Sequence, residues 1–209
     1  VEIANVIEQQ VNVTAQLYDA VGNAIGSEVL VLSPQRLRHR SYSHLLPIGA
    51  SGTFCLIPDQ PESIVSSSLT YYFAPNSEDL NVSAIDIATA AIIANPRVNT
   101  GVMTAYAAYN RYFGSYNWLR LTNQNGVDAE TTVTTNPGTR SQVAITFVVP
   151  AHGRFDVPLH DSIFFLRSDT AGAFSVEGDV RKDLIRIIPS AENRSLSGAG
   201  GDLYLSLPI

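Results

Sequence analysis

The strongest constraint on this chain is a hairpin-like pattern that occurs twice. The first copy runs from Asn12 to Pro34 and reads NVTAQLYDAVGNAIGSEVLVLSP. Apolar residues alternate with polar ones from Val11 to Leu17, which is the pattern of a half-buried β-strand. The segment Asp19 to Asn23 predicts a turn, in which Gly22 can adopt a positive φ. The apolar run Glu28 to Leu32 then predicts a second strand, long enough to be buried on both faces.

A shift of about 116 positions brings the first copy onto a second one without a gap. The second copy turns at Asn136-Pro137-Gly138-Thr139, where Pro followed by Gly is typical of a type II turn. Further downstream, SIFFLR matches TFCLI, so that Phe164 is expected to correspond to Phe54 in a strand. The aligned anchor pairs are Gly22 with Gly138, Pro34 with Pro150, His44 with His160, Leu17 with Val133, Val29 with Ile145, and Val31 with Phe147.

This duplication predicts an all-β fold of two tandem immunoglobulin-like β-sandwiches. Strands of five to ten residues separated by turn signals are typical of such sandwiches. We expect the first sandwich over residues 1–82, a packed connecting segment over 83–116, the second sandwich over 117–190, and a flexible tether with a terminal strand over 191–209. The stretch Ala84 to Ala94 fits either a short helix, because of its alanines, or a buried strand, because of its isoleucines.

Composition narrows the classes of function. The chain has 209 residues and a net charge of −6, which disfavours a nucleic-acid partner because phosphate binding needs a basic face. The basic cluster of Arg36, Arg38, Arg40 and His39 is expected to form a solvated strand face. The single cysteine, Cys55, excludes an internal disulfide and is expected to be buried. No stretch reaches the roughly 18 apolar residues of a membrane span, so membrane insertion is not expected.

The search for catalytic motifs gives none. There is no Gly-x-Ser-x-Gly elbow, no phosphate-binding loop between a strand and a helix, and no His-x-x-x-His or cysteine pair for zinc. The acidic spots at Glu78-Asp79 and Glu177-Gly178-Asp179 lack the oxygen density of a calcium loop. His44 and His160 are expected to be inherited packing positions rather than a site used twice. We therefore expect a protein that is not an enzyme and has no cofactor and no metal.

Two segments remain as candidate interaction sites. A dense aromatic run could be a core, a subunit interface or a sugar-stacking platform; it comprises Tyr106, Tyr109, Tyr112, Phe113, Tyr116 and Trp118. The tail alternates cleanly at Leu203, Leu205, Leu207 and Ile209, which predicts a strand. This strand could add to an exposed sheet edge of a neighbouring molecule, or it could fold back as the last strand of its own domain.

The paired hairpins, QLYDAVGNAIGSEVLVLSP and TTNPGTRSQVAITFVVPAHGRFDVPL, resemble the immunoglobulin-like or fibronectin-III-like repeats of bacterial and archaeal surface proteins. Members of that group carry a similar YD-x-x-GN-x-(I/V)-G hairpin followed by a β run that ends in Pro. The resemblance covers about half of each copy. It implies an extracellular structural, adhesive or assembly role and supplies no catalytic residues.

Three functions follow as hypotheses. The first is a self-assembling structural or adhesive subunit of a surface layer, sheath or filament, with copies of itself as the partner. The second is a carbohydrate-binding surface module, and the third is a viral coat or spike protein. An extracellular location would also allow N-glycans on three sequons, which begin at Asn12, Asn81 and Asn193.

Overall fold

The computed structural model describes residues 1–47, 50–73, 85–93, 103–160, 162–188 and 203–208. Within these ranges the regular secondary structure is almost entirely antiparallel β-strand, which confirms the all-β prediction. The 3-10 helices are η1 (Ser43–Leu45), η3 (Tyr112–Gly114) and η4 (Ser162–Phe164). The strands are β1 (Glu2–Asn5), β2 (Val11–Asp19), β3 (Ala24–Leu32), β4 (Leu37–His39), β5 (Gly52–Pro58), β6 (Ile64–Phe73), β7 (Ile85–Ile93), β8 (Met103–Asn110), β9 (Tyr116–Thr122), β10 (Ala129–Thr135), β11 (Val143–Val149), β12 (Arg154–Pro158), β13 (Ala171–Gly178), β14 (Arg181–Ile188) and β15 (Leu203–Pro208).

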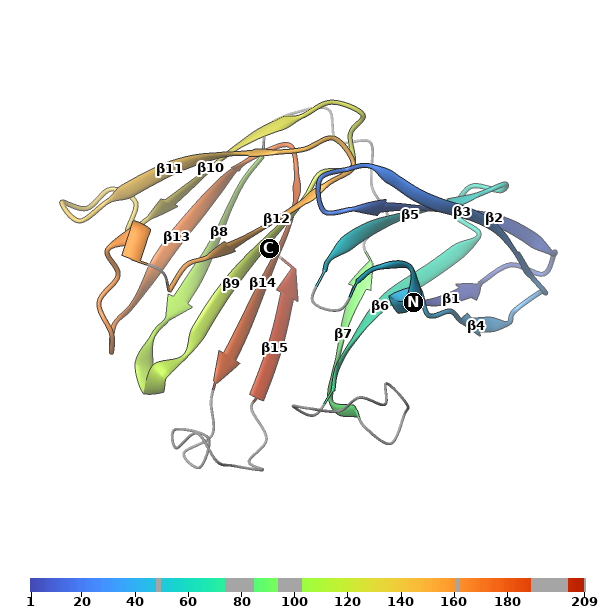
Figure 1. Ribbon diagram of the computed structural model, residues 1–209, viewed down its shortest axis with the longest axis horizontal. Helices are drawn as coiled ribbons and strands as arrows, with labels where there is room; N and C mark the ends of the chain where they lie inside the picture. Colours follow the sequence, from blue (N-terminus) through green and yellow to red (C-terminus); the bar gives the residue numbers. More distant parts are fainter. Residues whose placement is uncertain (48–49, 74–84, 94–102, 161, 189–202, 209) are drawn as a thin grey trace.

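The strands form two halves that lie side by side (Figure 1). In the first half, the sheet β4-β1-β6-β7 faces the sheet β3-β2-β5. Alternate residues of β2 point into the space between them, because successive side chains of a strand point to opposite faces. The resulting core is formed by Ile3, Val11, Val13, Ala15, Leu30 and Leu32.

The second half repeats this order of strands with one addition. The sheet β12-β9-β14-β15 corresponds to β4-β1-β6-β7, and the sheet β11-β10-β13-β8 corresponds to β3-β2-β5 with β8 added beyond β13. The core between these sheets includes Leu119, Leu121, Val133, Phe174, Val176 and Leu184. β7 and β15 lie next to each other where the two halves meet (Figure 1).

A buried asparagine closes the first half at the end of β1. The Asn5 side chain accepts a hydrogen bond from the Ile7 backbone N–H at 3.0 Å. Its amide nitrogen donates to the carbonyl oxygens of Gln9, Leu32 and Ser33 at 2.7, 3.2 and 3.1 Å. Asn5 is only 2 % exposed, so its amide satisfies backbone groups that would otherwise lack partners away from water.

Asn123 does the same at the end of β9 in the second half. Its oxygen accepts from the Asn125 backbone N–H at 2.9 Å. Its amide nitrogen donates to the carbonyl oxygens of Val127 and Val149 at 2.8 and 3.1 Å. The segments IAN (residues 3–5) and LTN (residues 121–123) therefore end with the same structural feature in the two halves.

The hydrogen bonds also correct the alignment of the two copies. Gln35 donates its backbone N–H to Ile7, and His152 donates to Asn125, and both donors have a positive φ. This equivalence requires a shift one or two positions longer than 116. The predicted pairs of Gly22 with Gly138, Pro34 with Pro150, and His44 with His160 are therefore not structural equivalents.

Two strand predictions are wrong, and both relied on an uninterrupted apolar run. Ser162–Phe164 is the 3-10 helix η4, so SIFFLR is not the counterpart of TFCLI; the register places Phe174 of β13 where Phe54 lies in β5. β3 is an edge strand whose outer face carries Val29 and Val31, which are 63 and 49 % exposed, so it is not buried on both faces. An uninterrupted apolar run has no hydrophobic periodicity, so it does not distinguish a strand buried on both faces from an edge strand or a short 3-10 helix.

The segment predicted as a connection, residues 83–116, contributes strands to both halves. β7 pairs with β6 of the first half, which selects the strand over the helix for this stretch. β8 pairs with β13 of the second half. The division between the halves therefore falls between Ile93 and Met103.

A direct contact joins the β2–β3 turn of the first half to the β11–β12 turn of the second. A Cβ on Gly22, which has a φ of +89°, would lie 2.0 Å from the carbonyl oxygen of Ala151. The Arg154 backbone N–H donates to the Ala20 carbonyl at 2.9 Å. The rings of Tyr18 and His152 stack with their centroids 4.7 Å apart. The turn therefore needs glycine at position 22 because another half of the molecule approaches its backbone.

Candidate functional site

The outer face of the sheet β12-β9-β14-β15 carries a row of aromatic rings. Tyr116 and Trp118 alternate along β9 with the buried residues Asn117 and Leu119, so both project outward. The His160 ring lies 4.9 Å from each of their centroids, at interplanar angles of 76° and 72°. The His160 Nδ1 atom lies 3.1 Å from the Asn117 carbonyl oxygen, which fixes the ring between its two neighbours.

A row of charged residues lies next to these rings and crosses the strands β12, β9 and β14. Arg120 is in register with Asp156 on one side and with Asp183 on the other. The Arg120 Nε atom lies 3.7 Å from an Asp156 carboxylate oxygen, and Arg154 also contacts Asp156. Arg181 and Asp183 form a second pair at 3.0 Å. Aromatic rings can stack on a ring-shaped ligand, and the ion-paired carboxylate and guanidinium groups beside them can hydrogen-bond to its hydroxyls.

The other members of the aromatic run lie elsewhere. Tyr109 is 3 % exposed and donates its hydroxyl to Asn136 Oδ1 at 2.9 Å, so it belongs to the core. Tyr106, 71 % exposed, lies on the outer face of the opposite sheet, in β8. Tyr112 and Phe113 lie in η3, where the Tyr112 side chain is exposed. The run is therefore not a single platform, and only Tyr116 and Trp118 share the face described above.

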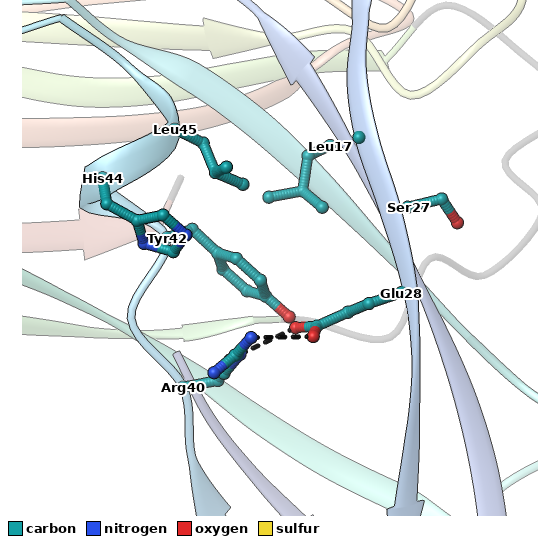
Figure 2. Close-up of a pocket in the computed structure, with 8 residues that line it drawn as sticks. Leu17, Ser27, Glu28, Arg40, Tyr42, His44 and Leu45 are labelled. Atoms are coloured by element: carbon teal, nitrogen blue, oxygen red, sulfur yellow. Dashed lines mark hydrogen bonds and ion pairs between the residues drawn. The ribbon is translucent and has the colours of Figure 1, made fainter.

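A small hollow opens between β3 and the segment that follows β4 (Figure 2). Its volume is about 200 Å³, which is below the usual range of a small-molecule site. Arg40 donates two hydrogen bonds of 2.9 Å to the Glu28 carboxylate, and the Tyr42 hydroxyl points toward the same carboxylate (Figure 2). Hydrogen bonding to Arg40 lowers the pKa of Glu28, whereas burial and the adjacent carboxylate raise the pKa of Tyr42. This arrangement ties the segment after β4 to β3.

The basic cluster predicted as a solvated strand face lies at this side of the first half. Arg36, Arg38 and His39 are exposed, and the His39 Nδ1 atom lies 3.9 Å from a Glu2 oxygen. The Arg40 guanidinium forms an ion pair with the Glu28 carboxylate. Within the described ranges, no three His, Cys, Asp or Glu side chains come together as metal ligands. In the same part of the chain, no helix is long and apolar enough to cross a membrane.

The tail is the last strand of its own sheet. β15 pairs with β14 in antiparallel register from Leu203 opposite Ile188 to Pro208 opposite Asp183. Of the two alternatives for the tail, the structure therefore has the one in which Leu203, Leu205 and Leu207 fold back on their own domain. Ile209 lies outside the described residues.

The remaining predicted residues have separate locations. The Asn12 side chain donates to Asp59 at 2.8 Å, so its amide is engaged in the folded chain. Asn81 and Asn193 lie outside the described residues. Cys55 is exposed on the outward face of β5, which corrects the prediction that it is buried. Partial burial still raises the pKa of its thiol.

A further feature, the outer edge of β5, was missed by the sequence reasoning. β8 covers the corresponding edge of β13, but none of the described strands pairs with the outer edge of β5. The signal was present in the alternating segment MTAYAAYN, which comes immediately before the second copy. No protein-family model matches this sequence, and no curated protein is similar to it.

Proposed function

We propose that this protein is a non-enzymatic structural or adhesive protein of an extracellular surface, in which copies of the chain associate with one another. The observation that carries the proposal is an apolar patch on the outer face of β3-β2-β5. Val29 and Ile57 lie on either side of Thr14 in register, and Val31 continues the patch along β3. Val29 is 63 % exposed, Ile57 is 45 % exposed and Val31 is 49 % exposed.

This patch has the character of an interface. Its residues do not belong to the buried core of either sandwich, so they are not needed to fill one. Its side chains lie on the same face of one sheet, with Val29 and Val31 adjacent on that face of β3, and exposed apolar residues gathered in this way mark sites of protein association. Tandem sandwiches that contact each other through their turns also suit a load-bearing or spacing role, in agreement with the resemblance to surface-protein repeats.

The test is light scattering over a concentration series, with negative-stain electron microscopy of the same samples. We expect the unmodified chain to form larger particles as its concentration rises. The double variant Val29→Thr/Val31→Thr should stay monomeric, because threonine keeps the shape and the strand preference but removes apolar surface. Val127→Thr is the matched control, since Val127 is 71 % exposed and lies in the second half away from the patch. A chain that stays monomeric at every concentration would contradict the proposal.

A second candidate function, carbohydrate binding, is favoured by the aromatic row. Tyr116, His160 and Trp118 lie next to the Arg120–Asp156 pair on one face, which offers both stacking and hydrogen bonding. Screening on a glycan array should then show binding that Trp118→Ala abolishes. Tyr106→Ala is the control, because Tyr106 is more exposed but lies on the opposite sheet. Equal binding by both variants would exclude this face as the binding site.

A further inference from the structure

The two halves differ in how one edge of one sheet is covered. In the second half, β13 is paired on both sides, with β10 and with β8. In the first half, the corresponding strand β5 pairs with β2, and no strand of the described residues adjoins its other edge. A strand paired on one side presents a row of free backbone N–H and C=O groups.

The missing neighbour leaves the first core partly open. Phe174 and Val176, which point into the second core from β13, are fully buried. Their equivalents in β5 are Phe54 and Leu56, as shown by the register of each strand against its central neighbour, and both are only partly buried. In the second half, β8 covers these side chains, and its inward-facing residues Ala107 and Tyr109 pack against the core.

β5 also lacks the sequence features that usually protect an edge strand, and the described part of the preceding segment packs against its first part, through Leu46 near Gly52 and Tyr42 near Phe54. Exposed edge strands are normally blunted by charged side chains, internal prolines or bulges. β5 reads GTFCLIP and contains no charge, its only proline is its last residue, and its pairing with β2 is continuous. The sequence of β8, MTAYAAYN, is uncharged as well, so the strand that covers the equivalent edge has matching chemistry.

We propose that the outer edge of β5 is a binding site for an extended, uncharged peptide segment that adds to the sheet in antiparallel orientation. The segment has the pattern of β8, with small side chains facing the core opposite Phe54 and Leu56. Main-chain hydrogen bonds provide the affinity and the small inward residues provide the fit. This site shares Ile57 with the apolar patch of the proposed function, but it uses the free backbone edge of β5, whereas the patch consists of side chains on the sheet face.

The two glycines at the start of these strands define where the added segment ends. Tyr109 lies over Gly172 at the start of β13, with its hydroxyl 2.7 Å from the position of a Cβ. Leu46 already occupies the corresponding place over Gly52, at 3.1 Å. At this end Thr53 also donates a hydrogen bond to the His152 carbonyl. The added segment therefore covers Phe54 to Ile57 and needs no aromatic residue at its far end.

The single cysteine of the chain allows a direct test. Cys55 is equivalent to Ser175, whose partner in β8 is Tyr106. The base peptide has the sequence of Met103–Asn110 with Tyr109→Ala, because Leu46 occupies the space of the tyrosine ring. A further change Tyr106→Cys would place its sulfur opposite Cys55. The matched peptide with Ala105→Cys would place its sulfur toward the core. Each peptide is supplied as its 2-pyridyl disulfide at mildly alkaline pH, where the Cys55 thiolate displaces pyridine-2-thione and forms the mixed disulfide.

We expect the Tyr106→Cys peptide to couple about 100-fold faster than the Ala105→Cys peptide, because docking raises the effective concentration of the two sulfurs. An excess of the unmodified peptide should suppress coupling, and a scrambled peptide should not. Equal coupling rates for the two cysteine positions, or no effect of the unmodified peptide, would overturn the proposal. The measurement is made at concentrations where light scattering shows monomers, so failure of self-assembly and failure of strand binding give separate results.

Discussion

The two halves of the chain have the same order of strands and the same buried asparagine, yet they end differently at one sheet edge. In the second half β8 completes a four-stranded sheet over the core. In the first half the described part of the equivalent sheet has three strands, and its inward residues remain partly exposed. The strand order and the buried asparagine, which both halves share, are therefore sufficient for the basic unit. The fourth strand that closes the core is described only in the second half.

The largest expected effect concerns this difference in closure. Phe174→Ala should destabilise the chain by about 4 kcal/mol, because the side chain is fully buried in a packed core. Phe54→Ala should cost about 2 kcal/mol or less, because its side chain is only partly covered. Chemical denaturation monitored by tryptophan fluorescence and by circular dichroism measures both. Equal losses would show that β5 is as well covered as β13.

The shared asparagines provide the test of equivalence. Asn5→Ala and Asn123→Ala should each lower the free energy of unfolding by about 3 kcal/mol, because each change leaves several buried backbone groups without partners. Asn→Asp at the same positions should be at least as damaging, since the carboxylate cannot donate to the backbone carbonyls. Denaturation curves of the four variants check this. A large loss in one half and none in the other would break the equivalence.

The turn glycines distinguish local strain from contact between the halves. Gly138→Ala should cost about 1 kcal/mol from its positive φ alone, because no atom lies within 4 Å of the added Cβ. Gly22→Ala adds a clash with the Ala151 carbonyl, so we expect about 2 kcal/mol and a separation of the halves. Small-angle X-ray scattering should show an increased radius of gyration for the Gly22 variant only. The same radius in both variants would contradict the contact.

The smallest expected effect is a pH dependence that arises from Lys182 in the second half. Lys182 is buried and donates to the carbonyl oxygens of Gly178 and Val180, and burial lowers its pKa. The unfolded chain therefore holds this proton more tightly, and stability contributed at this site is gained as pH rises from the lowered value toward about 10.4.

The equivalent position in the first half is Ser66, which has no charge to lose. Denaturation at a series of alkaline pH values should show the unmodified chain gaining stability relative to Lys182→Met. The difference between the unmodified chain and Ser66→Ala should stay constant. A pH-independent difference for Lys182→Met would show that the amine is not desolvated in the folded chain.

Sequence patterns predicted the elements whose signal is local. Alternation identified β2 and the tail strand β15, and Pro137 followed by Gly138 identified the turn, in which the Thr139 N–H donates to Asn136 at 3.2 Å. The partner of β15 was left open, because a strand pattern does not specify which edge it joins.

Other features depend on contacts between distant residues and could not be read from a local pattern. Phe164 is buried and Phe165 is 80 % exposed within one apolar run, because η4 and the positive φ of Phe165 send the rings in different directions. The aromatic run was divided for a similar reason. Its residues belong to two different sheets, and alternation sends neighbours such as Tyr116 and Asn117 to opposite faces.

Amide hydrogen exchange of the isolated chain tests the central difference between the halves most directly. Along β13, backbone N–H groups are paired toward either β10 or β8, so the whole strand should be protected. Along β5, the groups directed toward β2 should be protected, whereas the alternate amides at the outer edge should exchange at least about tenfold faster. Uniform protection along both strands would contradict the open edge on which the account depends.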